Sequence, residues 1–436
     1  MNGEIHMDAA AVGRPLAEPA KRGSSAGFPW VPVLVFLALW LGGSWAVVGA
    51  WIEPWIVGGW LTLAAIFALT ALPVVSLVRG VQGQSYPSAF TRLFVLRPFW
   101  YAMLFLPVLA AATLLGGAIG LPFGSAGPAG RWALAGASAL LVLGGLAGYL
   151  GSRRLVVRHL DVQMARLPPA FDGLRLVQIS DLHVGPHTPR QFLTRVAQAV
   201  EDARPDLIAI TGDQVDDFAR DVEIFRHAFA HLQAPLGVFA VAGNHDVYAG
   251  WSAVRRGLES AGFQVLVNES VAVERRGQQL FVVGTGDPAG LSALAQRGRG
   301  ASAESTAAPD VDRTLFRIPP SAPVLALAHN PMLWPSLARR GVDLTLSGHT
   351  HYGQLAIPKL GWSMASPFLR LAMGAHRDGD SMLYINPGTN YWGIPFRLGT
   401  PPEVTVLTLR CGTNGEVGIR QTRALPDQAC DRTNGA

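Results

Sequence analysis

The stretch LRLVQISDLHVG (174–185) decides the fold of this chain of 436 residues. Its first part, residues 174–180, is dominated by apolar residues and reads as a buried strand that ends at Asp181. Asp181 and His183 are two residues apart. In extended chain both side chains leave the same face and can bind one metal ion. A polar pair placed directly after a buried strand is therefore the first candidate for a binding site.

The same pattern, a buried strand followed by polar residues, recurs further along the chain. Strands are predicted at 206–211, 237–242, 324–328 and 342–346, and helices at 188–203 and 221–232. Strands that alternate with helices predict βαβ units and a largely parallel core sheet. The carboxyl ends of such strands meet at one edge of the sheet, which is where α/β folds bind ligands. The sequence thus predicts an α/β domain with its site at that edge.

The residues that follow these strands are of the types that hold metal ions. They are Asp181, His183, Asp213, Asn244, His329, His349 and His351. Mixed nitrogen and oxygen ligands favour manganese, iron or zinc, with magnesium as the alternative that prefers oxygen alone. Asp213 follows a glycine at a strand end, where its carboxylate could bridge two cations. Seven ligands with one shared carboxylate suit two divalent ions about 4 Å apart, the spacing used in metal-assisted phosphoester cleavage.

Taken singly, each of these residues has a simpler interpretation, because aspartates are common in turns and single histidines are common on surfaces. Five motifs in order at five strand ends are not expected by chance. They are DLHVG (181–185), GDQVD (212–216), GNHD (243–246), AHNP (328–331) and GHTH (348–351). With these motifs the chain resembles the calcineurin-like metallophosphoesterases over about residues 155–410. The stretch 385–409 resembles the membrane-attached bacterial branch of that family.

The resemblance implies a fold and a set of metal ligands. The fold would be a four-layer sandwich of two mixed sheets flanked by helices, with the site between the sheets. The first ion would be held by Asp181, His183 and His351, the second by Asn244, His329 and His349, and Asp213 would bridge the two. A hydroxide that bridges the ions would attack phosphorus in line.

The resemblance also implies roles for residues that do not bind metal. His245 would donate a proton to the leaving oxygen or stabilise its charge, and Asp246 would orient the ring of His245. Arg397, in IPFRLG (394–399), has two interpretations. It would either bind a phosphate of the substrate or form a structural ion pair with Glu403.

The chain before residue 155 has the composition of a membrane region. Hydrophobic residues make up 50% of the whole chain and charged residues 15%, with a mean hydropathy of +0.28. Soluble chains are usually about 25% charged, so part of this one is expected to lie in lipid. Four apolar runs approach the ~20 residues that a spanning helix needs. They are residues 30–50, 55–78, 99–120 and 132–150.

These observations predict four parts in the chain. They are a flexible tail (1–27), a transmembrane region of about four helices (28–152), the phosphoesterase domain (155–410) and a C-terminal tail (411–436). None of the apolar runs has a charge at its centre, which favours an anchor over a transport function.

Lysine and arginine residues predict the orientation in the membrane. They are concentrated before the first run, between the second and third, and after the fourth. The positive-inside rule then places both termini and the catalytic domain in the cytoplasm of a multi-pass membrane protein. Beyond residue 150 the chain has 28 Lys and Arg against 26 Asp and Glu. Because this part is almost neutral, no nucleic-acid partner is expected, and membrane lipid is the expected neighbour.

The sequence therefore predicts a membrane-anchored two-metal phosphoesterase that hydrolyses a phosphate mono- or diester, with a lipid-linked substrate as the narrower expectation. Two alternatives stay open. One is a pyrophosphohydrolase of a nucleotide-sugar lipid of the UDP-diacylglucosamine type, an activity known among relatives of this branch. The other is a non-catalytic metal-bound membrane sensor, which is disfavoured because every expected ligand and His245 are present.

Overall fold

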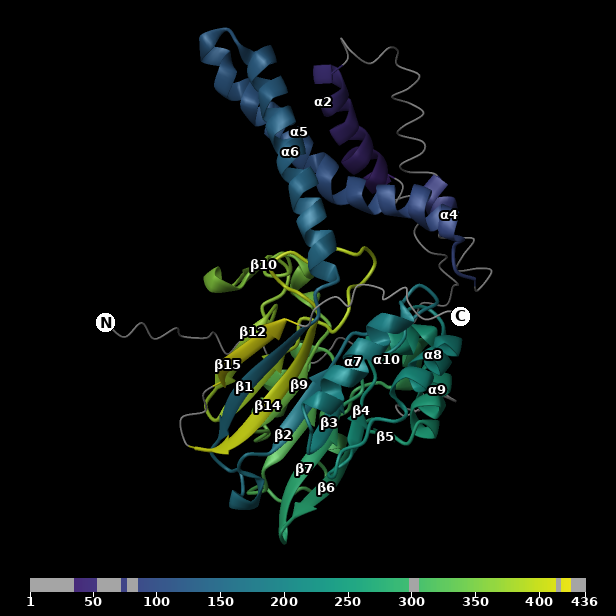
Figure 1. Ribbon diagram of the computed structural model, residues 1–436, viewed down its shortest axis with the longest axis vertical. Helices are drawn as coiled ribbons and strands as arrows, with labels where there is room; N and C mark the ends of the chain where they lie inside the picture. Colours follow the sequence, from purple (N-terminus) through teal and green to yellow (C-terminus); the bar gives the residue numbers. More distant parts are fainter. Residues whose placement is uncertain (1–34, 53–71, 77–84, 298–305, 413–416, 425–436) are drawn as a thin grey trace, which may run out of the picture. The chain divides into compact units, whose positions relative to one another are not determined.

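The computed structural model describes residues 35–52, 72–76, 85–297, 306–412 and 417–424 (Figure 1). The chain divides into two compact units, residues 1–137 and residues 138–436.

The first unit is helical where it is described. Its elements are η2 (Ala38–Gly42), α2 (Gly43–Ile52), α4 (Ala89–Thr91), η3 (Arg92–Leu96), α5 (Arg97–Gly120) and the first part of α6 (Ala126–Ser152). Two helical stretches, Ala89–Phe123 and Ala126–Ser152, are long and apolar enough to cross a membrane, and Val35–Trp51 forms a shorter apolar helix. Most of the expected run 55–78 lies outside the described residues. Among the described residues the structure therefore has two helices of membrane length, where the sequence predicted about four.

The second unit contains two large sheets. The strands of the first run in the order β15-β1-β14-β2-β3-β4-β5, and those of the second in the order β12-β13-β9-β8-β7-β6. The first sheet consists of β1 (Val156–Met164), β2 (Arg175–Ile179), β3 (Leu207–Ile210), β4 (Val238–Ala240), β5 (Gln264–Val265), β14 (Glu403–Cys411) and β15 (Val417–Ala424). The second consists of β6 (Glu269–Arg275), β7 (Gln278–Gly284), β8 (Val324–Leu327), β9 (Leu344–Ser347), β12 (Gly374–Asp378) and β13 (Ser381–Ile385).

Both sheets are mixed, as expected. Strands β2 to β5 pair in parallel, whereas β14 is antiparallel to β2 and β15 is antiparallel to β1. In the second sheet β7, β8, β9 and β13 are parallel, with antiparallel strands β6 and β12 at the two edges. Strand β15 occupies part of the stretch that was expected to be a tail, so the chain beyond residue 411 contributes to the sheet. A third, two-stranded sheet pairs β10 (Ala356–Ile357) with β11 (Trp362–Ser363).

Alternation along the strands divides the core into layers. In β3, Leu207 belongs to the apolar cluster shared with strands of the second sheet, whereas Ile208 belongs to the cluster shared with helices. Side chains of a strand alternate between its two faces, so one strand supplies both clusters. The helices of the second cluster are α7 (Arg190–Asp202), α8 (Val222–Phe229) and α9 (Asn244–Ser260).

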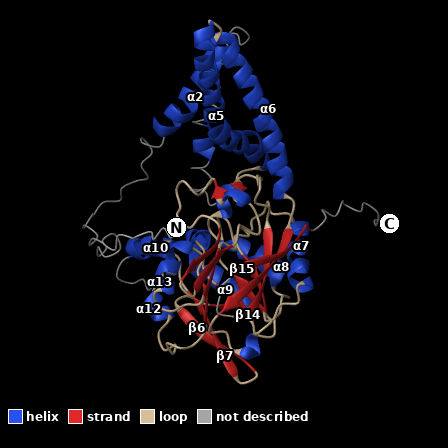
Figure 2. Cartoon of the chain, turned by 90° about the vertical axis from the view of Figure 1, so that its left-hand side faces the viewer, coloured by secondary structure: helices blue, strands red, loops and turns tan. Residues whose placement is uncertain are grey.

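The other face of the second sheet packs against α12 (Val311–Thr314) and α13 (Trp334–Ala338), through Val311 and Leu337. A further helix, α10 (Ala289–Arg297), follows β7. Figure 2 shows helices on both sides of the strands.

The connections bring several carboxyl strand ends to one place. Strands β2, β3 and β4 end at the motifs that begin with Asp181, Gly212 and Gly243, and β8 and β9 end at His329 and Gly348. Backbone hydrogen bonds join the chain just beyond these ends, from Asp181 N to Gly212 O (3.0 Å) and from Gly348 N to His329 O (3.0 Å). Helix α7 begins at Arg190 with Pro189 as its N-cap, one residue later than the predicted N-cap at Thr188.

Candidate metal centre

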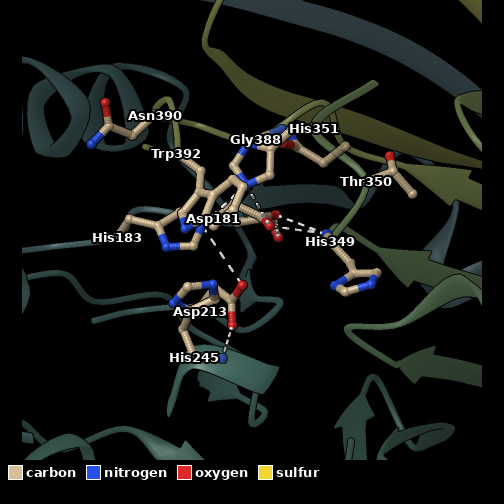
Figure 3. A network of polar contacts seen from close by, with 12 residues as sticks. Asp181, His183, Asp213, His245, His349, Thr350, His351, Gly388, Asn390 and Trp392 are labelled. Atoms are coloured by element: carbon tan, nitrogen blue, oxygen red, sulfur yellow. Dashed lines mark hydrogen bonds and ion pairs between the residues drawn. The ribbon is translucent and has the colours of Figure 1, made fainter. Parts of the chain in front are cut away.

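The structure brings the seven predicted metal ligands together at the strand ends of both sheets. Asp181 and His183 follow β2, Asp213 follows β3, Asn244 begins α9, His329 follows β8, and His349 and His351 follow β9. Figure 3 shows the side chains of Asp181, His183 and His351 close together, with Asp213 and His245 beside them and the backbone nitrogen of His349 facing Asp181.

The first group of side chains consists of Asp181, His183 and His351. The Nε2 atom of His351 lies 3.0 Å from Nε2 of His183 and 3.3 Å from Oδ1 of Asp181. All three residues are buried. One donor atom from each of them lies within 4.8 Å of the others, a separation that a single metal ion can bridge.

The second group consists of Asn244, His329 and His349. The Oδ1 atom of Asn244 lies 2.8 Å from Nδ1 of His349 and 3.2 Å from Nε2 of His329. These donors come from three different strand ends, and two of the strands belong to the second sheet.

Asp213 lies between the two groups. Its Oδ2 atom is 3.7 Å from Nε2 of His183 and 3.3 Å from Nε2 of His329. Its other oxygen, Oδ1, accepts the backbone N–H of His245 at 2.8 Å. One carboxylate oxygen thus faces a histidine of each group, which is the arrangement that a bridging ligand requires.

Five of the seven candidate ligands have backbone angles in the left-handed region. Their φ values are 53° for Asp181, 42° for His183, 51° for Asp213, 70° for His349 and 49° for His351. Residues other than glycine adopt this region rarely, at a cost on the order of 1–3 kcal/mol each. Such strain gathers at functional sites, where the surrounding structure enforces it. The sharp turns are what redirect these side chains from the strands toward a common point.

Two glycines of the motifs lie where a carboxylate approaches the backbone so closely that a larger residue would not fit. A Cβ atom at Gly243 would collide with the carboxylate of Asp213, and a Cβ at Gly348 would collide with that of Asp181. The glycines of GNHD and GHTH therefore leave the space that the two carboxylates occupy.

Burial and neighbouring charge act against each other at the two carboxylates. Burial raises the pKa of Asp181, and the nearby charge of Asp213 raises it further. Burial also opposes ionisation of Asp213, but the charge and hydrogen bond of His329, together with His183, hold its pKa well below the ordinary value. His329 mirrors this: burial opposes its protonation, and Asp213 nevertheless raises its pKa well above the ordinary value. The site therefore favours positive charge beside Asp213.

The residues present fit two divalent cations. Lone-pair donors face one another here: imidazole nitrogen of His183 against that of His351, and the amide oxygen of Asn244 against Nδ1 of His349. Nδ1 of His183 is buried without a hydrogen-bond partner and lies 3.4 Å from Oδ1 of Asp216. A carboxylate behind a histidine is a common support for a metal ligand.

His245 lies beside the first group, with its ring 4.6 Å from that of His183. Its Nδ1 atom is 2.9 Å from the backbone carbonyl oxygen of Asp216, so Nδ1 carries a proton and donates it. Nε2 is then the nitrogen available to a substrate. Burial lowers the pKa of His245, against the opposing effect of Asp213.

Among the residues that the structure describes, Asp246 makes no direct hydrogen bond to the ring of His245. Its carboxylate accepts the backbone N–H groups of Gln214 (3.0 Å), Val215 (3.2 Å) and Gly243 (2.8 Å), and is fully buried. It therefore fixes the loop after β3 against the start of α9. The partner of the His245 ring is Asp216, through a backbone atom, and the sequence interpretation missed it although Asp216 is the last residue of GDQVD.

Arg397 does not form the predicted ion pair with Glu403. It is 1% exposed, and its guanidinium donates to backbone carbonyls and to the ring of His351. Glu403 instead pairs with Arg158 at 2.5 Å and accepts the hydroxyl of Tyr384. Arg397 thus lies behind a candidate metal ligand and not on the open side of the site.

Two exposed aromatic residues beside His245 were not predicted. Tyr248 and Trp392 are 68% and 47% exposed, and each ring lies 5.8 Å from that of His245. The open side of the site is therefore flanked by aromatic surface.

Together, the two mixed sheets and the aspartate–histidine cluster define a metal-binding α/β domain of the kind found in phosphoesterases. Residues 174–353 match the family model of the calcineurin-like phosphoesterases. Residues 174–353 thus contain a calcineurin-like phosphoesterase domain, as the motifs predicted, and the relatives found for this part of the chain are named metallophosphoesterases.

Relatives include a Danio rerio protein named "transmembrane protein with metallophosphoesterase domain", 31% identical over 58% of this chain and 57% of its own length. The uncharacterized metallophosphoesterase YkuE of Bacillus subtilis is 29% identical over 61% of this chain and 89% of its own length. The chain thus spans little more than half of the first of these relatives. Among solved structures, the sulfate thiohydrolase SoxB of Thermus thermophilus aligns with a TM-score of 0.34 and 16% identity, covering 60% of this chain and 57% of its own.

We predict that Asp213→Asn removes metal from the site. The substitution takes away the negative charge that faces both histidine groups, so metal content and phosphoester hydrolysis should both fall steeply. Elemental analysis of the purified protein and hydrolysis of bis-p-nitrophenyl phosphate check this. Asp312→Asn is the control, because the Asp312 side chain is 81% exposed. Two metals per chain and full activity in Asp213→Asn would contradict the assignment.

Proposed function

We propose that this chain is a membrane-anchored phosphoesterase that works with two divalent metal ions and hydrolyses phosphate mono- or diesters. The observation that carries the proposal is the position of Asp213 Oδ2, which lies within 4 Å of a histidine from each ligand group. The calcineurin-like phosphoesterase domain supports the same reaction class.

In this proposal Asp181, His183 and His351 hold the first ion, Asn244, His329 and His349 hold the second, and Asp213 is shared. The ions supply Lewis acidity toward a phosphoryl oxygen and a water molecule of lowered pKa. Manganese, iron or zinc suits this mixture of nitrogen and oxygen donors best.

The protein's own contribution to the reaction is orientation and proton transfer. The carbonyl oxygen of Asp216 keeps the Nδ1–H of His245 occupied, which leaves Nε2 as the ring nitrogen available to a substrate. Protonated His245 then donates from Nε2 to the leaving oxygen as the bond to phosphorus breaks. Trp392 and Tyr248 flank this position and offer flat apolar surface to the group that leaves.

A substrate panel on the detergent-purified full chain tests the proposal. The arms are p-nitrophenyl phosphate, bis-p-nitrophenyl phosphate, a nucleotide-sugar lipid and phospholipids, each with manganese, zinc or magnesium. Metal-dependent release of phosphate or of an alcohol from at least one arm is expected. Release of a nucleotide monophosphate from the nucleotide-sugar lipid would identify a pyrophosphohydrolase. Two bound metals with no turnover of any arm would favour the non-catalytic sensor.

We predict that His245→Ala lowers the rate by about 10²–10⁴, as for the loss of a general acid. Metal content should stay close to that of the unaltered chain, because no metal-ligand role is assigned to the His245 ring. The loss should be smallest for p-nitrophenyl esters, whose leaving group needs little protonation. His231→Ala is the control, since that side chain is 52% exposed. If metal and activity are lost in proportion, His245 is a ligand and the proposed role is wrong.

We also propose that residues 28–152 anchor the phosphoesterase domain, residues 155–410, at the cytoplasmic face of a membrane. Two helices of membrane length and relatives named as transmembrane proteins support the anchoring. Arg153 and Arg154 follow the last helix. Anionic lipid of the inner leaflet attracts such basic residues by about 1 kcal/mol each. A lipid-linked phosphoester would be the natural substrate at this location.

The orientation makes a separate prediction. Green fluorescent protein fused after Ala436 should fluoresce, and alkaline phosphatase fused at the same place should be inactive, because the first folds in the cytoplasm and the second outside it. The two fusions control each other. The opposite pattern would place the domain outside and move the substrate to the cell envelope.

A further inference from the structure

The buried guanidinium of Arg397 connects the loops that carry the first ligand group. Nη1 donates to the carbonyl oxygens of His351 (3.0 Å) and Pro387 (2.6 Å). Nη2 donates to Nδ1 of His351 (2.9 Å) and to the carbonyl oxygen of Asn390. Every one of these acceptors lies on the His349–His351 loop or on the loop after β13.

Asn390 extends this connection to the other two ligands. Its side-chain amide donates to the carbonyl oxygen of Leu182 (2.8 Å), and its backbone N–H donates to that of Asp181 (3.3 Å). Leu182 lies between the ligands Asp181 and His183. Arg397 is therefore one or two hydrogen bonds away from the chain that carries all three residues of the first group. Figure 3 shows Gly388 next to His351, and Asn390 nearer to His183.

The bond to His351 constrains which nitrogen of that ring carries a proton. Guanidinium has five N–H donors and no acceptor, so Nδ1 of His351 accepts here, and in a neutral ring the proton lies on Nε2, the nitrogen that faces Asp181 and His183. A metal ion on Nε2 requires the proton on Nδ1 instead, which breaks this one bond, so the support that Arg397 gives to the loaded site runs through the carbonyl oxygens of His351, Pro387 and Asn390. The fit is tight, because a Cβ on Gly388 would lie 2.7 Å from Nη2 of Arg397 and 2.8 Å from Nδ1 of His351.

The backbone of Arg397 is held by the last turns of helix α6. Its N–H donates to the carbonyl oxygen of Gly148 at 2.8 Å. A Cβ atom on Gly151 would collide with the carbonyl oxygen of Arg397, and one on Gly148 would collide with the ring of Phe396. The helix thus approaches this segment as closely as only glycine allows.

A merely structural arginine would be expected to have a counter-ion. Among the residues that the structure describes, no ion pair of Arg397 is found, although the side chain is 1% exposed. An unpaired buried charge is expensive. All four atoms that accept hydrogen bonds from this guanidinium belong to the loops of the metal site. Holding these loops together is therefore the interaction that offsets the free-energy cost of the buried charge.

We propose that Arg397 is a positioning residue for the first metal ion, and that the end of α6 sets the position of Arg397. The helix that anchors the chain is thereby a structural part of the metal centre. This inference rests on the proposed function, because it takes Asp181, His183 and His351 as ligands of one ion.

Arg397→Lys and Arg397→Met test the first half, in the full chain in detergent and with Mn²⁺ as the probe. Titration followed by electron paramagnetic resonance and elemental analysis gives the affinity of each ion. Loss of a group that supports a ligand typically weakens binding by about 10–100-fold. We expect that loss for one ion only, with Arg397→Lys less affected than Arg397→Met, and a shifted visible spectrum of the Co²⁺-loaded variants.

Equal weakening of both ions together with a lowered melting temperature would mean a general structural role and would overturn the proposal. Wild-type affinity for both ions in Arg397→Met would overturn it as well. If the unaltered chain itself binds fewer than two ions, the proposed function fails, and that result is distinct from either outcome for the variants.

Gly151→Ala tests the second half, because it adds only the atom for which the structure has no room. Gly144→Ala is the matched control on the same helix, since a Cβ there meets nothing within 4 Å. Gly151→Ala should weaken the same ion as Arg397→Lys, and Gly144→Ala should bind as the unaltered chain does. Wild-type binding of both ions by folded Gly151→Ala would show that the helix does not set the position of Arg397.

Discussion

Two carboxylates, Asp181 and Asp213, are buried in one site, and the rest of the centre compensates for their charge. Asp181 accepts the hydroxyl of Ser180 at 2.5 Å and the backbone N–H of His349 at 2.9 Å. Asp213 accepts the backbone N–H of His245 and faces His183 and His329. Neutral donors and histidines alone stabilise such charges only in part, because burying ions costs several kcal/mol each in proteins. Divalent cations bound at the shared position would complete the compensation, and this would account for the convergence of so many side chains there.

This constraint ties the site to the packing of the two sheets, because neither sheet supplies the ligands alone. Gln178 of β2 donates to Thr211 Oγ1 (2.9 Å) and to the carbonyl oxygen of Ser347 at the end of β9 (3.0 Å). Thr389 donates its backbone N–H to the carbonyl oxygen of Ser180 at 2.7 Å. The bond to Ser347 crosses from the first sheet to the second, and the bond of Thr389 joins the loop after β13 to the end of β2. A shift between the sheets would therefore change the spacing of the two ligand groups, and the polar core and the metal centre must be kept in register together.

The sequence was sufficient for the parts of the structure that depend on residue type and order. Apolar strands followed by Asp181, Asp213 and His329 identified the strand ends, and the seven ligand candidates do meet. It was insufficient where backbone atoms or burial decide. The partner of the His245 ring is the backbone carbonyl oxygen of residue 216, and the type of side chain at that position does not reveal it. The sequence therefore pointed to Asp246 as the partner. The position of Arg397 depends on the close approach of α6, which requires glycines that look like ordinary helix residues in an apolar run. The sequence around strand β15 shows no strong alternation of apolar and polar residues. Its place in the sheet depends on its pairing with β1.

Five candidate ligands have a left-handed backbone conformation, so the site carries backbone strain. Each such residue costs on the order of 1–3 kcal/mol, and a folded domain is stable by only about 5–15 kcal/mol in total. The turns therefore persist only because other interactions hold them, namely the bonds from Asp181 N to Gly212 O and from His183 N to Asp213 O, and the clamp of Arg397 on His351. A ligand that binds only the folded state adds stability in proportion to the logarithm of its concentration over its Kd. Metal binding and the left-handed backbone of these loops must then stabilise each other. A substitution that weakens the hold of Arg397 on His351 should therefore also weaken binding of the ion.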